Sequence, residues 1–274
     1  MTNFVTHPAT QKQVSLLKAD LPQSLLLSGV VGVGLLTTAK QLGGKNVTHQ
    51  LYPKDSRGTR DDAGGVIAVE AIRDLYAQTR SKRKVHQVVI IDDADRMSLG
   101  AQAAFLKLLE EPNPSVHFIL TSHLPDILLP TIRSRVQQVN LRPLTYQQTI
   151  DYIATLKVAG TDHAKLLFVA EGLPAELYRL AHDQAYFQNR AAIMSDAKTL
   201  LTAGGYEVLL ALQKYLSDRL LVIQLIESAL LIARRSLSTH PQPKLVQNVK
   251  TLLDIREKLA ANHSVRLQLI RTVL

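Results

Sequence analysis

Apolar and polar positions along the first half of the chain follow a pattern that predicts short strands separated by helices. Apolar runs of strand length occur at Ser24–Leu27, Val47–Tyr52, Gln87–Ile91, Val116–Thr121 and Val136–Leu141. Between them, apolar residues recur with helical spacing at Leu35–Gln41, Val69–Thr79 and Ala101–Leu109. Strands that alternate with helices in this way predict an α/β fold, with a mostly parallel sheet covered by helices.

The pattern changes after Pro143, because the spacing of apolar residues is helical from there to the end of the chain. We therefore expect three parts: an α/β core at residues 1–143, a small helical bundle at 144–187 and a second helical domain at 188–274. A chain of 274 residues is long enough for several parts with their own cores.

The most apolar stretch, Leu220–Ile232, is interrupted by Gln224, Glu227 and Ser228. It is shorter than a membrane span and predicts a buried amphipathic helix instead. The N-terminus lacks the basic flank and apolar stretch of an export signal, so we expect a cytoplasmic protein with no membrane partner. Hydrophobic residues make up 46% and charged residues 20% of the chain, as in ordinary globular domains.

Charge and cysteine content narrow the possible chemistry. The formal net charge of +9 is compatible with a polyanionic partner and equally with a solvated basic surface. The basic run Arg80–Lys84 has the same two interpretations, a solvated loop or a loop that faces DNA. The absence of cysteine excludes disulfides, thiolate catalysis and sulfur-ligated zinc. Aromatic residues are only 5%, which argues against a stacking platform for single strands.

A glycine-rich turn between a strand and a helix is the first candidate for chemistry. Residues 25–36 read LLLSGVVGVGLL. In the phosphate-binding pattern G-x-x-x-x-G-K-[ST], Gly29 and Gly34 fall at the two glycine positions, and Gly32 lies within the turn. Such a turn can bind phosphate through backbone N–H groups at a helix N-terminus.

The two side chains that this pattern needs for chemistry are missing. Leu35 occupies the position of the lysine that reaches the β- and γ-phosphates, and Leu36 occupies the position of the hydroxyl that binds Mg²⁺. Thr37 and Thr38 follow too late to replace that hydroxyl. We therefore expect a degenerate nucleotide site with weak or absent binding of ATP and Mg²⁺, and no other cofactor.

A second candidate is a pair of carboxylates at the end of an apolar strand. Asp92 and Asp93 follow the run VVII. In P-loop NTPases the first acid at this place holds Mg²⁺ and the second, usually glutamate, polarises the attacking water. Acids here could also cap the next helix, as could Asp95. Thr121, at the end of another strand, could bind a phosphate or only satisfy the end of its strand.

A third candidate is the arginine-rich run TIRSRV at residues 131–136. An arginine at the end of a helix can supply positive charge to a γ-phosphate that a neighbouring subunit binds. Spacing alone favours the simpler interpretation, in which Arg133 and Arg135 are surface arginines. His86, His117 and His123 flank strands, and we expect all three to be structural.

Two longer segments are more specific. The segments AFLKLLEEPNP, which begins at Ala104, and LLPTIRSR, which ends before Val136, resemble the bacterial DNA polymerase III clamp-loader subunits, the delta prime and gamma/tau members of the AAA+ superfamily. The resemblance extends from Pro8 to about Leu144 and is weaker beyond. It implies an AAA+ core, with residues 144–187 as its helical lid and residues 188–274 as a collar domain that joins the subunits of an assembly.

Departures from the gamma type point to the delta prime branch. Leu35 lacks the lysine, and Ala175 stands where gamma-type subunits carry a nucleotide-sensing arginine in the lid. The Gly172-Leu173-Pro174 sequence before it is similar to delta prime. The serine–arginine–cysteine motif of the family reads Ser134-Arg135-Val136, so its arginine is retained. The four-cysteine module of many relatives is missing, so we expect no zinc.

The resemblance implies a non-hydrolysing stator subunit that offers Arg135, beside Ser134, to the nucleotide of a neighbouring ATPase subunit. The implied partners are gamma/tau-type ATPase subunits and the delta subunit, with the sliding clamp and primed DNA reached through the assembly. Two alternatives remain at this point. The chain could be an active gamma/tau-like ATPase with an unusual loop, or a free-standing basic DNA-binding protein.

Overall fold

The structure is a computed structural model, and it describes residues 5–61, 64–79, 86–158, 160–216, 218–239, 242–260 and 264–271. The chain divides into two compact units, Met1–His182 and Asp183–Leu274. The basic run Arg80–Lys84, for which a loop was expected, lies outside the described residues.

A five-stranded parallel sheet forms the centre of the first unit, with the strand order β2-β3-β4-β1-β5. The strands are β1 (Ser24–Ser28), β2 (Val47–Leu51), β3 (Gln87–Ile91), β4 (Val116–Ser122) and β5 (Gln137–Asn140). In the register, Leu25 of β1 lies between Ile119 of β4 and Gln137 of β5. The central strands are apolar on both faces, as expected for a sheet covered on both sides.

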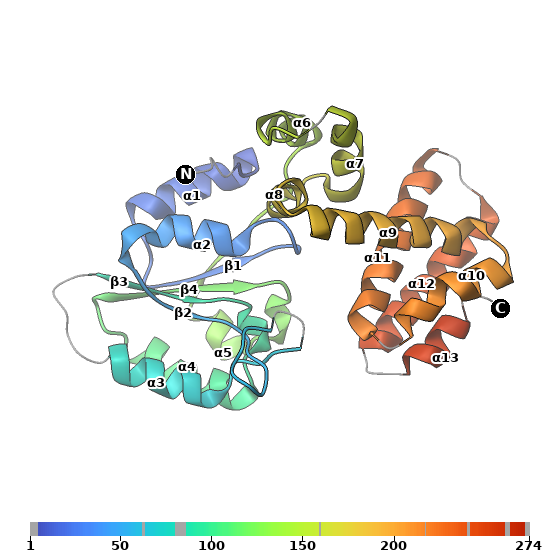
Figure 1. The fold of residues 1–274 in the computed structure, drawn as a ribbon. Helices are drawn as coiled ribbons and strands as arrows, with labels where there is room; N and C mark the ends of the chain where they lie inside the picture. The colour runs from blue at the N-terminus through green and yellow to red at the C-terminus, as the bar shows by residue number, and fades with distance from the viewer. Residues whose placement is uncertain are drawn as a thin grey trace. The chain divides into compact units, whose positions relative to one another are not determined.

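Helices cover both faces of this sheet (Figure 1). One face packs against α1 (Pro8–Ala19) and α2 (Leu35–Gly43), and the other against α3 (Val69–Thr79), α4 (Leu99–Glu110) and α5 (Pro130–Arg133). The alternation of side chains along a strand explains the division. On β1, Leu25 and Leu27 enter the core under α1 and α2, whereas Leu26 enters the core under α3 and α4.

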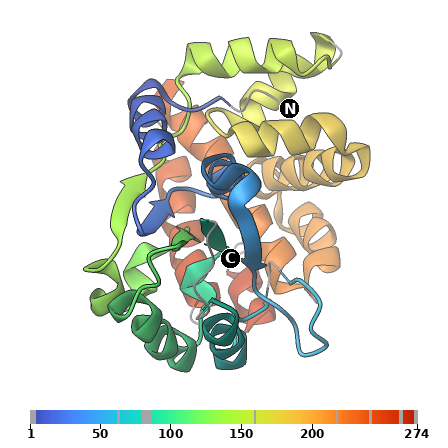
Figure 2. The ribbon, with the colours of Figure 1, turned by 90° about the vertical axis from the view of Figure 1, so that its left-hand side faces the viewer.

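Three further helices belong to the same unit but lie outside the sheet layers, as Figures 1 and 2 show in yellow-green. They are α6 (Tyr146–Thr155), α7 (Gly160–Ala170) and α8 (Pro174–His182). A capping box starts α6, because the Thr145 hydroxyl accepts from the Gln148 N–H and the Gln148 side chain accepts from the Thr145 N–H. They lie within residues 144–187, where the sequence predicts a small helical bundle.

The second unit is helical in its described part. Its helices are α9 (Gln184–Thr202), α10 (Gly205–Leu212), α11 (Arg219–Thr239), α12 (Pro243–Ala260) and α13 (Val265–Ile270). The run predicted to form a buried amphipathic helix lies in α11, where Val222, Leu225, Ile226 and Ala229 are buried. Ser228 is also buried, and its hydroxyl accepts a hydrogen bond from Arg190 at 2.9 Å.

The predicted α/β class is confirmed, and each expected strand lies within two residues of its observed bounds. The boundary that we expected after residue 187 falls inside α9, since the two compact units meet between His182 and Asp183. Short 3-10 turns occur at Gly44–Asn46, Ala94–Arg96, Pro125–Ile127 and Gln213–Tyr215. None of the helices in the described ranges is long and apolar enough to cross a membrane.

Candidate functional site

The glycine-rich turn and the two acids lie at the same edge of the sheet. Gly29 follows β1, Asp92 follows β3, and Thr121 lies near the end of β4. These three strands are adjacent in the sheet, with β4 between β3 and β1. The carboxyl ends of parallel strands are where open α/β sheets bind ligands. The structure therefore brings together the predicted nucleotide-site residues, whereas Ser134 and Arg135 lie elsewhere, on the turn that leads to β5.

The turn contains glycines with positive φ angles. Gly34 has a φ of +95° and occupies the N-cap of α2, with no side-chain cap. Thr38, buried in the first turns of α2, donates its hydroxyl hydrogen to the Gly34 carbonyl at 3.0 Å. That hydrogen bond lies inside the first turns of the helix.

The middle of the turn is bound to α8, in the segment for which the resemblance implies a lid. The Gly32 carbonyl accepts a hydrogen bond from the backbone N–H of Ala175 at 3.0 Å and a longer one from that of Glu176 at 3.4 Å. These N–H groups belong to the first turn of α8, where helices have donors without an internal partner. A Cβ added at Gly32 would lie 3.1 Å from the Glu176 Cβ and 3.3 Å from the Leu173 Cβ. The turn thus caps α8 and is packed against it.

The two leucines in place of the catalytic side chains are part of the core. Leu35 is 4% exposed and belongs to the cluster beneath α1 and α2, which also contains Leu25, Leu27 and Val33. Leu36 is partly buried and packs against the same cluster. The side chain at the lysine position therefore points into the protein and contributes apolar burial, with no group for a phosphate.

The carboxylate of Asp92 already has a cationic partner within the chain. Asp92 is 4% exposed, and its Oδ2 accepts a hydrogen bond from an Arg60 guanidinium N–H at 2.8 Å. Its Oδ1 accepts from the Thr121 hydroxyl, also at 2.8 Å. The Arg60 guanidinium also lies 5.2 Å from the centre of the Tyr52 ring. Both oxygens that would face a metal ion are thus hydrogen-bonded to protein groups.

Thr121 connects the two acids. Its buried hydroxyl donates to Asp92 and accepts from the backbone N–H of Asp93 at 3.0 Å. Of the two roles that the sequence left open for Thr121, this geometry corresponds to satisfying the protein's own groups. Burial raises the pKa of Asp93 above its ordinary value of 3.8, and the negative charge of Asp92 acts in the same direction.

His123 joins the acids to the glycine-rich turn. Its Nδ1 lies 2.8 Å from the Gly29 carbonyl, to which it must donate because that oxygen can only accept. Its Nε2 lies 3.7 Å from Oδ1 of Asp93. Its backbone N–H donates to Asp95 Oδ1 at 3.2 Å, and α4 is capped by Ser98 rather than by Asp95.

Sequence reasoning missed Arg60 entirely and assigned His123 only a general structural role. Arg60 comes from the loop after β2, where isolated backbone bridges join Lys54 to Arg60 and to Val66. Arg60 and Asp92 are far apart in the sequence, and no helical or strand periodicity relates their positions. Only the folded loop brings the guanidinium to the carboxylate.

Arg135 and Ser134 lie on the surface, at the turn between α5 and β5. The Arg135 side chain is 39% exposed. Its NH1 donates a hydrogen bond to the Thr131 carbonyl oxygen at 3.0 Å, and its NH2 lies 3.1 Å from Oε1 of Glu110. The Ser134 hydroxyl donates to the same Thr131 carbonyl at 3.1 Å. Arg133 differs, since it pairs with Asp126 at 2.6 Å.

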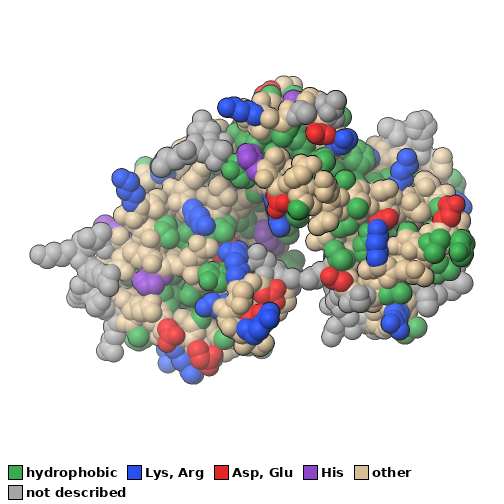
Figure 3. Space-filling model, viewed as in Figure 1, with side chains coloured by type: hydrophobic (Ala, Val, Ile, Leu, Met, Phe, Trp, Pro, Cys, Tyr) green, Lys and Arg blue, Asp and Glu red, His purple; other side chains and the backbone are tan. Residues whose placement is uncertain are grey.

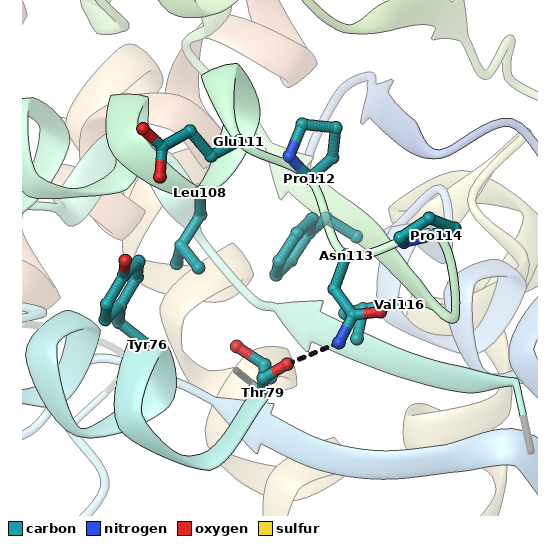
Figure 4. Close-up of a pocket in the computed structure, with 9 residues that line it drawn as sticks. Tyr76, Thr79, Leu108, Glu111, Pro112, Asn113, Pro114 and Val116 are labelled. Carbon is teal, nitrogen blue, oxygen red and sulfur yellow. Dashed lines mark hydrogen bonds between the residues drawn. The ribbon is translucent and has the colours of Figure 1, made fainter. Parts of the chain in front are cut away.

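A separate cavity of about 250 Å³ lies between the C-terminal ends of α3 and α4 (Figure 4). Tyr76, Leu108 and Phe118 line it, and Asn113 spans it by donating to the Thr79 carbonyl at 2.8 Å. Its lining contains none of the predicted nucleotide-site residues. In the part of the chain that the structure describes, no group of three or more His, Asp or Glu side chains is placed to hold a metal ion.

Residues 43–145 match the family described as DNA polymerase III, delta subunit. DNA polymerase III subunit delta' of Pseudomonas aeruginosa is 33% identical over 146 residues, which are 52% of this chain and 44% of that protein. Subunit delta' of Bacillus subtilis is 30% identical over 128 residues, 46% of this chain and 38% of that protein.

The small subunit of replication factor C from Aeropyrum pernix is 29% identical over 140 residues, which cover 47% of this chain and 41% of that protein. The chain thus matches less than half the length of each of these relatives. The relatives are named as subunits of replication proteins.

Solved structures show the fold. A DNA polymerase III gamma subunit-related protein from Thermotoga maritima has a TM-score of 0.63 at 19% identity, covering 95% of this chain and 97% of that one. A variant of RuvB from the same organism has a TM-score of 0.51 at 15% identity, covering 89% and 88%. The chain is thus similar in part of its sequence to the delta' subunits of DNA polymerase III and to the subunits of replication factor C, and it shares the fold of the gamma subunit-related protein.

Proposed function

We propose that this chain is a delta prime-type stator of a sliding-clamp loader, which does not hydrolyse ATP itself. In this role it supplies Arg135 to the nucleotide of a neighbouring gamma/tau-type ATPase subunit. The delta subunit is a further partner, and the sliding clamp and primed DNA are reached through the assembly. The similarity to clamp-loader subunits supports such an assembly, and the contacts of Asp92 and Leu35 support a subunit that does not hydrolyse ATP.

The observation that carries the proposal is the internal neutralisation of Asp92. In an active P-loop NTPase, the corresponding carboxylate faces Mg²⁺. Here the Arg60 guanidinium and the Thr121 hydroxyl hold both of its oxygens at 2.8 Å. A metal ion would have to displace a cation that is already paired with this buried acid. Together with the buried Leu35, this favours a site that has lost its affinity for Mg-ATP.

Arg135 has the features that a trans-acting arginine requires. It lies on the surface, is partly exposed, and is held by two contacts. A guanidinium has five N–H donors in a planar arrangement that suits phosphate oxygens. An arginine supplied across an interface stabilises the charge that develops on the transferred phosphoryl group.

The test of this function uses the complex reconstituted from this chain and its ATPase subunits. Arg135→Ala should lower DNA-stimulated ATP turnover at the adjoining site by on the order of a thousandfold. Assembly and folding of the chain should be unchanged. Arg57→Ala is the matched control, because its guanidinium is also paired at the surface, with Asp55, and its side chain is 85% exposed. Near-normal turnover with Arg135→Ala would refute the proposed role.

Calorimetry on the isolated chain separates this proposal from an active ATPase. We expect no tight binding of Mg-ATP and no turnover. Binding in the micromolar range together with hydrolysis by the lone chain would favour a gamma/tau-like ATPase and overturn the proposal.

A free-standing DNA-binding protein would bind DNA without partners, with an affinity that falls steeply as salt rises. On the face of the N-terminal unit that Figure 3 shows, Lys and Arg side chains are interspersed with Asp and Glu side chains. We therefore expect the isolated chain to bind DNA weakly and to co-purify with a gamma/tau-type subunit.

A further inference from the structure

The guanidinium of Arg135 is held by two different helices of the N-terminal unit. Its NH1 donates to the carbonyl of Thr131, which belongs to α5, at 3.0 Å. Its NH2 is 3.1 Å from Oε1 of Glu110, the last residue of α4. Two anchors on separate elements fix the plane of the guanidinium more firmly than either contact alone. No other described residue engages the remaining N–H groups of Arg135.

Glu110 lies where the helix itself does not favour an acid. The C-terminal end of a helix carries a partial negative charge, which repels a carboxylate and attracts a cation. The pair with Arg135 compensates for this, but it is well exposed, at 39% for the arginine side chain and 52% for the glutamate. An ion pair this exposed contributes little to the stability of a fold. Its main physical effect is therefore on the orientation of the arginine.

We propose that Glu110 is a positioning residue that orients Arg135 toward a phosphate bound by a neighbouring subunit. This inference rests on the proposed function. A flexible arginine side chain would have to be ordered at each turnover, whereas a guanidinium held by Glu110 and Thr131 presents its free donors in a fixed direction. Preorganised donors lower a barrier because no reorganisation is needed during the reaction.

The experiment measures ATP turnover at the adjoining site of the reconstituted complex. Glu110→Ala should lower kcat by about tenfold, with the KM for ATP, the assembly of the complex and the unfolding temperature unchanged. Glu110→Gln keeps an oxygen that accepts a hydrogen bond, and it should recover part of the loss. An unchanged or raised kcat in Glu110→Ala would overturn the inference.

Glu111→Ala is the matched control. It removes the same charge from the next residue, which is also exposed. Glu111 lines the cavity between α3 and α4 (Figure 4), whereas the acid that pairs with Arg135 is Glu110. Its kcat should equal that of the parent chain. An equal loss in both variants would mean that charge near the end of α4 acts in general, and it would overturn the specific role of Glu110.

A double variant separates positioning from an independent effect. If Glu110 acts through Arg135, Glu110→Ala should cause no further loss in an Arg135→Ala background. A further tenfold loss in that background would overturn the inference and leave the proposed function intact. Normal turnover of Arg135→Ala itself would refute the proposed function, and this inference with it.

Discussion

The Arg60 guanidinium and the Asp92 carboxylate form a hydrogen-bonded ion pair at 2.8 Å, at the C-terminal end of β3. The arginine side chain is 37% exposed, whereas that of the acid is 6% exposed. The pair therefore joins a solvent-accessible loop to a buried strand end. The guanidinium thus neutralises the charge of the buried acid from within the protein itself.

Removing this cation should destabilise the chain. Arg60→Ala leaves Asp92 with only the Thr121 hydroxyl as a described side-chain partner, and we expect a loss of about 2 kcal/mol in the free energy of unfolding. Urea unfolding of the isolated chain measures this loss. Arg57→Ala removes a much more exposed pair and should cost below about 1 kcal/mol. Equal effects of the two substitutions would contradict the assignment of Arg60 as the counter-ion of a buried acid.

Restoring the lysine of the phosphate-binding pattern should not restore nucleotide binding. Leu35→Lys places an ammonium group where the side chain is 4% exposed and packed among leucines. We expect a loss of at least about 2 kcal/mol in the free energy of unfolding, since apolar burial is lost and a charge is desolvated. Thermal unfolding with and without Mg-ATP measures both effects.

Leu36→Lys is the control for that substitution, because Leu36 is only partly buried. Leu36→Lys should lower the free energy of unfolding by less than Leu35→Lys does. A Leu35→Lys chain that is stabilised by Mg-ATP would show that the cradle still accepts a triphosphate, and it would contradict the interpretation of a closed site.

The contact between the glycine-rich turn and the lid can be tested with two glycines of similar conformation. Gly32 has a φ of +85° and Gly58 a φ of +82°. A Cβ at Gly32 would meet Glu176 at 3.1 Å, whereas nothing lies within 4 Å of a Cβ at Gly58. Gly58→Ala should cost about 1 kcal/mol from backbone strain alone, and Gly32→Ala about 1–3 kcal/mol more from steric overlap with the lid.

Denaturant unfolding of both alanine variants measures the difference. Proteolysis of residues 144–182 under native conditions provides a second measurement, because a weakened contact should make cleavage in the lid faster for Gly32→Ala only. Equal costs for the two variants would mean that the turn and the lid do not support each other.

The raised pKa of Asp93 predicts a pH dependence. The folded chain holds this proton to a higher pH than the unfolded chain does, mainly because the carboxyl is buried. The contribution of Asp93 to the free energy of unfolding therefore falls as the pH rises from about 3.8 through the raised pKa of the folded chain. At neutral pH the ionised, buried carboxylate still lowers the stability. Asp93→Asn removes the ionisation, so the variant should be more stable than the parent at pH 7, with the difference shrinking toward acid pH.

Comparison of the two chains by urea unfolding across this range cancels the contributions of all other carboxyl groups. The expected gain is reduced by the loss of the favourable interaction with His123. An advantage of Asp93→Asn that grows as the pH falls would contradict the sign of the shift.

The pattern of apolar residues was sufficient to predict the strands of the sheet and several of its helices. β3 and α3 have the bounds that the sequence predicts, because an apolar run buried on both faces and a helical repeat are local properties. The order of the strands required the tertiary structure, since β1 lies between β4 and β5 although both follow it late in the chain.

By itself, the sequence determined the missing chemistry of the glycine-rich turn, because Leu35 and Leu36 are identified by their positions in a contiguous motif. Tertiary structure alone decided which side chains from separate elements meet. Arg60 reaches Asp92, His123 reaches Gly29 and Glu110 reaches Arg135 only after folding. Such contacts depend on the directions of side chains from separate elements, and spacing along a chain does not encode those directions.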